Sequence, residues 1–331
     1  MDGQTDNLGN TEIYEESISR LVSVDVIKNS ALSEERLKKY QNIVKSNKHS
    51  PKQAIIEPHN FTKSMNTKDK LKFFTRILPK ALSSVRNVKI SFKDLQKNPE
   101  MPTKLAGPEF IKDFENYAYY LGIGKIGYTK ITPNLVFQDS SVLFPNVIVL
   151  MYEMNKDLIQ KAPSFDTFKM IMGTYKELNQ HTNLLANFLR RKNFAAQAGP
   201  ALGGVSNYVV MAKNANFGWV GKHGLLITPE FGPRIRLSVI FTNIQNLPIS
   251  QVDKDNSHSW IESFCKKCSE CVNACPGSAI LTKPIITKKT QYTHINNKNC
   301  YPYFYNQYGC TVCIKSCPFS YRDYKELRLE V

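Results

Sequence analysis

No cysteine precedes Cys265, and all 8 cysteines of this 331-residue chain lie between Cys265 and Cys317. This clustering leaves no thiol for a disulfide framework across the chain, and disulfides belong to oxidising compartments. A chain of this length can also bury a core without such crosslinks. The cysteines therefore indicate a local site.

Long apolar runs are also missing. The run Phe144–Met151 suits a buried strand and is far shorter than the roughly 20 residues that span a bilayer. The opening Met1–Asn7 contains no twin-arginine pair and no basic segment before an apolar one. We therefore expect a cytoplasmic protein with no membrane span, in a reducing compartment that suits thiolate ligands.

Acidic residues are fewer than basic ones: the chain has 28 Asp and Glu and 44 Lys and Arg, which gives a net charge of +16. Such an excess occurs in proteins that bind nucleic acid or an anionic membrane surface. No arginine-rich block or aromatic-interleaved basic stripe stands out, and the excess is spread along the chain. We therefore favour a lysine-rich solvated surface and keep a tRNA partner as an alternative.

The cysteines form two runs, and the first, from Cys265 to Pro276, has the spacing C-x2-C-x2-C-x3-C-P. This is the bacterial ferredoxin spacing for [4Fe–4S] clusters, in which the cysteine before the proline ligates the other cluster. The second run ends at Cys317-Pro318 and has Cys300 as an outlying thiolate. We therefore predict two [4Fe–4S] clusters. The predicted ligands are Cys265, Cys268, Cys271 and Cys317 for the first cluster, and Cys275, Cys300, Cys310 and Cys313 for the second.

Zinc is the alternative metal, because C-x2-C pairs also build zinc sites. Zinc does not explain the third closely spaced cysteine, Cys271, or the two Cys-Pro endings. The spacing therefore favours iron–sulfur clusters.

Residues 1–100 show local patterns but no site chemistry. Apolar spacing predicts an amphipathic helix over Ser33–Val44 and a lysine-rich helix near Leu71–Leu78. Alternation predicts strands at Gln53–Ile56 and Val88–Phe92. We treat 1–100 as an N-terminal extension of unclear role.

From Gly107 the pattern becomes α/β. The predicted helices and strands are Pro108–Leu121, Ile123–Ile131, Asn146–Tyr152, Pro163–Lys192, Leu225–Thr228 and Ile235–Phe241. Polar Asp253–Ser259 reads as a linker, so we predict one domain over 101–252 and a cysteine-rich domain over 253–331. Glycines gather in Gln197–Asn207 and Gly218–Gly232, where the backbone can lie close to a large ligand; a plain surface loop is the alternative.

The segment Gly224–Leu237, followed by this cysteine layout, resembles the reductive dehalogenase family. The ending Cys300–Phe319 is similar to that family's second cluster region. The turn Gly218–Lys222 resembles the sister family, the epoxyqueuosine reductases, which share the double-cluster plan. The likeness spans roughly Gly107–Phe319.

The resemblance implies a nitroreductase-like α/β (α+β) domain that binds cobalamin or a related corrinoid, followed by a two-[4Fe–4S] bacterial ferredoxin-like domain. The corrinoid would lie between that domain and the clusters. No D-x-H-x-x-G run supplies a histidine to cobalt, so we expect no protein histidine as its lower ligand. The expected corrinoid contacts are Gly199, Gly203, Gly204, Asn207, Gly221, Lys222, His223 and Gly224.

The resemblance also implies a proton donor. Dehalogenases carry a tyrosine in the helix before the glycine-rich loop, and Tyr175 is the best match; Arg234 and Arg236 match a basic pair that lowers its pKa or binds a leaving anion. Tyr175 as a core aromatic, and the arginines as sheet-edge partners, are the alternatives. Epoxyqueuosine reductases place an acidic donor near the Gln197 position, and an amide cannot give up a proton near neutral pH.

The leading prediction is an oxidoreductase: a cobalamin-dependent iron–sulfur reductase of the dehalogenase type. An external low-potential donor, a ferredoxin or flavodoxin, would pass electrons through two clusters to a corrinoid that reduces a small-molecule substrate. One alternative is a tRNA-modifying enzyme like epoxyqueuosine reductase. Another is a ferredoxin-type electron carrier with no chemistry of its own.

Overall fold

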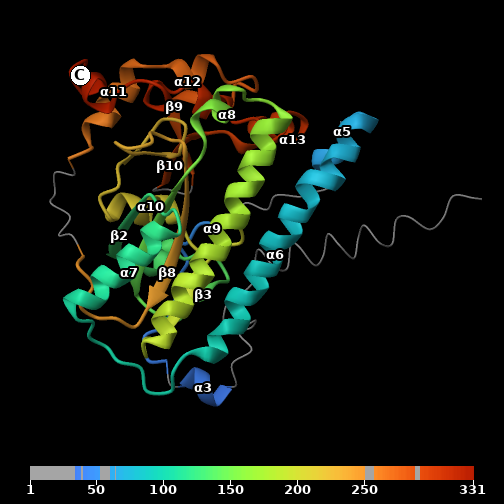
Figure 1. Ribbon diagram of the computed structural model, residues 1–331. Helices are drawn as coiled ribbons and strands as arrows, with labels where there is room; N and C mark the ends of the chain where they lie inside the picture. Colours follow the sequence, from blue (N-terminus) through green and yellow to red (C-terminus); the bar gives the residue numbers. More distant parts are fainter. Residues whose placement is uncertain (1–33, 39, 53–59, 64, 250–256, 288–290) are drawn as a thin grey trace, which may run out of the picture.

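The computed structural model describes residues 34–331 except 39, 53–59, 64, 250–256 and 288–290 (Figure 1). The strand predicted at Gln53–Ile56 and most of the Asp253–Ser259 linker lie outside the described residues. In the part of the chain that is described, no helix is both long and apolar enough to cross a bilayer.

The first described elements are a short helix and a strand. Helix α3 covers Glu34–Lys38, and strand β1, Val44–Lys45, pairs antiparallel with β3, Ser141–Val142. The helix predicted over Ser33–Val44 is therefore wrong beyond Lys38. Val44 lies opposite Val142 in the ladder, so strand pairing overrides the helical spacing of the apolar residues.

A nearly continuous helical stretch follows. It consists of α4 (Asn60–Lys63), α5 (Thr67–Lys72), the π-helical turn η1 (Phe73–Ile77), α6 (Leu78–Lys93) and the 3₁₀ turn η2 (Asp94–Lys97). Helix α6 packs along the long helix α9, Phe165–Arg191 (Figure 1). The lysine-rich helix near Leu71–Leu78 is confirmed, whereas the strand at Val88–Phe92 is wrong because it belongs to α6. The extension therefore packs closely against the following domain.

A four-stranded antiparallel sheet forms the centre of the fold, in the order β2-β4-β8-β5. Its strands are β2 (Lys125–Lys130), β4 (Asn146–Glu153), β8 (Ile235–Thr242) and β5 (Ala196–Gly199). Because the strands are antiparallel, the domain is of the α+β type. The strand predictions at Ile123–Ile131, Asn146–Tyr152 and Ile235–Phe241 are confirmed.

Both faces of this sheet are buried, and β4 contributes to each. Val147 and Val149 join the core that includes helix α10, Tyr208–Asn214. Ile148 and Leu150 point to the other core, which includes α7 and α9. Such alternation is the two-residue period of a strand covered on both sides.

The predicted helices around the sheet are also confirmed. Helix α7 covers Pro108–Tyr120, and α9 begins after Ser164, whose hydroxyl accepts a hydrogen bond from the Thr167 N–H at 3.2 Å. The remaining elements before the linker are η3 (Pro133–Leu135), α8 (Lys156–Gln160), β6 (Trp219–Val220) and β7 (Leu226–Ile227).

The cysteine-rich part contains short helices and one hairpin. Its elements are α11 (Trp260–Lys267), α12 (Glu270–Asn273), β9 (Ile280–Thr287), β10 (Gln291–Ile295), α13 (Asn297–Asn306), α14 (Val312–Lys315), η4 (Pro318–Ser320) and α15 (Tyr324–Arg328). In Figure 1 its helices lie together near the start of α9, in orange and red.

Two close approaches join this part to the rest of the chain. A Cβ at Gly232 would lie 2.0 Å from the Phe319 carbonyl oxygen, and the ring of Phe61 packs against that of Phe304 at 5.4 Å. Gly232 has a positive φ of 56°, so both backbone conformation and space favour glycine there. The cysteine-rich part is thus packed against both the sheet domain and the N-terminal helices.

Candidate iron–sulfur and active site

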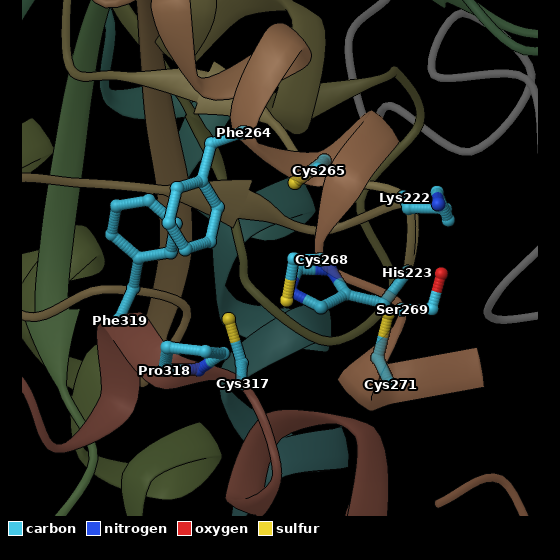
Figure 2. A pocket seen from close by; sticks show the side chains of 10 residues that line it. All are labelled: Lys222, His223, Phe264, Cys265, Cys268, Ser269, Cys271, Cys317, Pro318 and Phe319. Atoms are coloured by element: carbon cyan, nitrogen blue, oxygen red, sulfur yellow. The ribbon is translucent and has the colours of Figure 1, made fainter. Parts of the chain in front are cut away.

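The first predicted cysteine set surrounds one cavity. Cys265, Cys268, Cys271 and Cys317 all line it, and Figure 2 shows their sulfurs around a shared space. Cys268 is the C-cap of α11 in an extended conformation, so the chain turns there before α12 carries Cys271. Cys317 lies just before η4 and is followed by Pro318, as in the cysteine that ligates the other cluster of a two-cluster ferredoxin.

Burial makes these thiols weak acids. It raises the pKa of Cys271 to about 11, and raises that of Cys317 well above the ordinary value for a thiol. Iron binds thiolates, so cluster assembly must displace these protons, and the positive charge of the metal favours that displacement.

Lys222 and His223 come from the turn between β6 and β7 and line the same cavity. Their exposed fractions are only 8% and 5%. Burial raises the pKa of Cys265 and Cys271, and the positive charge of Lys222 offsets part of that rise. Two residues predicted to touch a corrinoid therefore lie against the first cysteine set.

The second set also comes together. Cys275 and Cys310 are close enough to raise the pKa of Cys300, although burial is the larger cause. Burial, followed by the other three members of the set and Cys271, raises the pKa of Cys313 to about 12. Helix α12, which carries Cys271, packs against α14, which carries Cys313, so the two sets are neighbours.

The loop before α14 holds Cys310 in an unusual conformation. Tyr308, Gly309, Cys310 and Thr311 have φ values of 49°, 76°, 45° and 60°, all left-handed. Only Gly309 adopts this region without steric cost, so the loop stores strain of about 1–3 kcal/mol per non-glycine residue. Strain of this kind is concentrated at ligand-holding loops, and spacing alone did not predict it.

In the part of the chain that is described, no three His, Cys, Asp or Glu side chains are placed to hold a single metal ion. Four sulfurs around a common space are instead the donor set of a cubane, which offers one iron to each thiolate. The chemistry and arrangement of both sets therefore fit [4Fe–4S] clusters.

Tyr175 and Arg236 are in direct contact. The Arg236 guanidinium carbon lies 4.6 Å from the centroid of the Tyr175 ring, and its Nε is buried without a hydrogen-bond partner. Tyr175 is half-buried in α9 and packs against an apolar cluster that Cys313 also contacts. The predicted tyrosine therefore contacts an arginine of the sheet and shares an apolar cluster with one cysteine of the second set.

Arg234 has a different environment. Its Nη1 donates to Glu153 Oε1 at 2.6 Å and to the Met154 carbonyl at 3.2 Å, and its Nε donates to the Ser320 carbonyl at 3.0 Å. These bonds tie the sheet to the cysteine-rich part. Of the two predicted arginines, Arg236 is therefore the one beside Tyr175.

The glycine-rich loop is filled by the chain itself. A Cβ at Gly199 or Gly204 would lie 2.6 or 2.2 Å from the Tyr208 hydroxyl, and Gly203 faces Val88 with a φ of 86°. Asn207 is the N-cap of α10, accepting from the Val210 N–H at 3.2 Å. These residues therefore have packing and capping roles of their own.

Gly221 and Gly224 shape the turn that carries Lys222 and His223. The Gly224 N–H donates to the Gly221 carbonyl at 2.9 Å, and Gly224 has a positive φ of 75°. A Cβ at Gly221 would lie 2.9 Å from the His223 ring. Both glycines therefore position the residues on the first cavity.

Three buried polar atoms at the glycine-rich loop have no hydrogen-bond partner among the residues that the structure describes: Asn179 Nδ2, Ser206 Oγ and the Tyr208 hydroxyl. Asn179 belongs to the loop environment because its Oδ1 accepts from the Leu202 N–H at 3.3 Å. Burial raises the pKa of Tyr208, so its hydroxyl remains a hydrogen-bond donor. Unsatisfied buried donors are costly and suit a polar ligand such as a corrinoid amide. Sequence reasoning did not identify Asn179 or Ser206, whose residue types alone carry no signal.

Gln197 is a structural residue in β5. It is 2% exposed, and its Oε1 accepts from the Leu143 N–H at 2.8 Å. It therefore cannot replace an acidic proton donor.

Comparisons with known proteins identify one domain family and two groups of similar reductases. Residues 264–321 match the 4Fe-4S dicluster domain family. The tetrachloroethene reductive dehalogenase of Sulfurospirillum multivorans is 30% identical over 205 residues, which are 58% of this chain and 39% of that protein. The epoxyqueuosine reductase of Listeria monocytogenes is 24% identical over 248 residues, 62% of this chain and 63% of that protein.

A solved reductive dehalogenase, described with a mechanism for B12-dependent dehalogenation, superposes with a TM-score of 0.64 and 18% identity over 88% of this chain and 44% of that one. The predicted fold class is thereby confirmed. The chain spans about two fifths of the length of the dehalogenases it matches, 39% in the Sulfurospirillum case. The chain is thus a relative of the reductive dehalogenases and epoxyqueuosine reductases, with the reductive dehalogenase fold and a 4Fe-4S dicluster domain.

Proposed function

We propose that this chain is an iron–sulfur reductase of the reductive dehalogenase type, in which two [4Fe–4S] clusters deliver electrons to a corrinoid. The observation that carries this proposal is the position of Tyr175, which contacts Arg236 and packs against the same apolar cluster as Cys313. A potential proton donor and an electron route thereby lie next to each other.

The eight cysteines hold the clusters in this proposal. Cys265, Cys268, Cys271 and Cys317 share one cavity; in the second set, burial and the neighbouring thiols of the set raise the pKa of Cys300 and of Cys313. An external low-potential carrier such as a ferredoxin or flavodoxin supplies the electrons. Because the two sets adjoin through Cys271 and Cys313, an electron arriving at one cluster has a short path to the other.

Asn179, Ser206 and Tyr208 would hold the corrinoid through their unpartnered polar atoms. A bound corrinoid supplies a low-valent cobalt that can reduce a carbon–halogen or carbon–oxygen bond. The protein's own contribution is placement of the substrate and delivery of a proton.

Tyr175 is the proposed proton donor. An ordinary phenol has a pKa near 10 and is a slow acid at neutral pH. A guanidinium next to the ring favours the phenolate that remains after proton transfer. Arg236 has a buried Nε without a protein partner, so it is also available to a departing anion.

The direct test is anaerobic reconstitution with iron, sulfide and corrinoid, followed by turnover with a halogenated substrate and a chemical reductant. We expect release of halide that depends on the corrinoid. Cluster assembly without corrinoid binding in equilibrium dialysis would reject the reductase and leave a ferredoxin-type electron carrier.

A tRNA-modifying reductase is the second candidate. The net charge of +16 and the epoxyqueuosine reductase relatives favour it, whereas the buried amide of Gln197 counts against it. Phosphate contacts release counterions, so specific tRNA binding should weaken steeply with salt. Retention of an epoxyqueuosine tRNA stem loop at physiological salt, with its reduction on addition of electrons, would favour this candidate over the dehalogenase.

A further inference from the structure

His223 is a buried histidine with one nitrogen unaccounted for. Its side chain is 5% exposed and lines the cavity of the first cysteine set. Figure 2 shows its imidazole among the cysteine side chains that line this cavity. Nε2 is buried and has no partner among the described residues.

The other ring nitrogen determines which tautomer is present. The backbone N–H of Leu225 donates to His223 Nδ1 at 3.2 Å, so Nδ1 must offer its lone pair. In a neutral imidazole the proton then resides on Nε2. The nitrogen without a protein partner is therefore a donor.

The turn is built to keep the ring in this place. Gly221 lies next to the imidazole, because a Cβ there would approach His223 Cε1 to 2.9 Å and Nε2 to 3.3 Å. The Gly221 N–H donates to the Leu225 carbonyl at 2.9 Å, which fixes the turn whose Leu225 N–H orients the ring. The ring position is thus set by the backbone on both sides.

From this geometry we infer that His223 donates a hydrogen bond through Nε2–H to a sulfur of the first cluster and so raises the reduction potential of that cluster. The inference rests on the proposed function, because it requires the cluster to form. A reduced cluster carries more negative charge on its sulfurs than an oxidised one, so a donor stabilises the reduced state more. His223 is therefore a positioning and tuning residue for the cluster, with no contact to substrate implied.

These surroundings should affect the reduction potential of the first cluster and not that of the second. The first set has a buried imidazole donor and the buried cation Lys222 beside it. Both features favour reduction of the first cluster. We therefore expect the first cluster to be reduced at a higher potential than it would be in an environment of backbone donors alone.

The test is a redox titration of the reconstituted holoprotein, followed by electron paramagnetic resonance, for the wild type, His223→Leu and His223→Gln. Leucine fills the space without a donor, and glutamine retains an N–H. We expect His223→Leu to lower the equilibrium constant for reduction of the first cluster at least threefold, which is about 28 mV at about 59 mV per tenfold for one electron. His223→Gln should recover at least half of that shift.

The second cluster is the internal control, and its potential should stay constant in both variants. Its signal is identified by its loss in Cys300→Ser. In D2O, the wild type should also show an exchangeable deuteron coupled to the first cluster, and His223→Leu should lack it.

The possible results distinguish the His223 hydrogen bond from the proposed reductase function. A first cluster that forms with an unchanged potential in His223→Leu overturns the hydrogen bond and leaves the reductase intact. Strong nitrogen coupling from direct iron ligation by His223 also overturns it. Failure of the wild-type protein to form the first cluster overturns both the inference and the proposed function.

Discussion

The guanidinium of Arg236 lies over the ring of Tyr175, 4.6 Å from its centroid, although the two residues come from the sheet and from helix α9. The contact leaves the tyrosine hydroxyl at the rim of the ring free to act elsewhere. It also gives Arg236 a fixed position while its Nε remains without a protein partner.

Tyr175→Phe removes only the hydroxyl and retains the ring against Arg236. If the hydroxyl delivers the proton, turnover should fall about 100-fold, the usual scale for a general acid. Iron and corrinoid contents should not change. Tyr120→Phe, at a tyrosine that is 85% exposed, is the matched control and should have full activity. Full activity in Tyr175→Phe would show that the proton comes from another group.

Substitution of Arg234 should mainly lower stability, whereas substitution of Arg236 should mainly lower turnover. Arg234→Met leaves the Ser320 and Met154 carbonyls without their buried donor, so the free energy of unfolding should fall by about 2 kcal/mol. The Nε of Arg236 has no hydrogen-bond partner among the described residues, so Arg236→Met breaks no bond at that atom. This variant should lower turnover, and its free energy of unfolding should fall less than that of Arg234→Met. Urea unfolding and steady-state turnover measure the two effects. Equal loss of stability in both variants would contradict the assignment.

Two cubanes should give about eight iron atoms per chain on anaerobic reconstitution. Cys300→Ser should lose the second cluster and retain the first, because Cys300 lies with Cys275 and Cys310. Cys265→Ser is the reciprocal variant and should lose the first cluster. Four or fewer iron atoms in the fully reconstituted wild type, or equal loss of both clusters in Cys300→Ser, would argue against the predicted grouping.

Tyr208→Phe tests the corrinoid site without any activity assay. The buried hydroxyl has no partner, so its removal should leave the corrinoid-free protein equally stable or more stable by about 1 kcal/mol. If the hydroxyl bonds to a corrinoid, the same variant should weaken corrinoid binding about fivefold to tenfold, since about 1.4 kcal/mol corresponds to tenfold. Thermal unfolding and equilibrium dialysis give the two values. Unchanged corrinoid affinity would place the corrinoid elsewhere.

The cysteine grouping could be predicted from the sequence because it depends on short spacings and one crossover rule. The roles of the glycines could not be predicted, because they depend on contacts with side chains from other parts of the chain. Gly199 and Gly204 look like ligand-facing positions until Tyr208 is placed against them. Likewise, the sequence did not indicate that Lys222 and His223 line the cavity of the first cysteine set; their contact with a corrinoid stays a prediction.

Local pattern also misassigned two segments. Val88–Phe92 alternates apolar and polar residues, as a strand does, but Ser84, Val88 and Ser91 are buried at helical spacing in α6. Small serines on that buried face allow α6 to lie close to α9. For Ser33–Val44 a helix was predicted where part of the segment is a strand. Val44 is held in that strand by pairing with Val142, which lies almost one hundred residues further along the chain.

The crossover of Cys275 and Cys317 constrains the order of assembly in the cell. In the proposed ligation, the first cluster lacks its fourth thiolate until Cys317, the last of the eight cysteines, has left the ribosome. The second cluster is complete earlier, at Cys313. The first site receives its first cysteine before the second site does, but the second site receives its full set of four before the first. A chain truncated between Cys313 and Cys317 should therefore complete only the second site, so the electron route depends on the last of these eight cysteines.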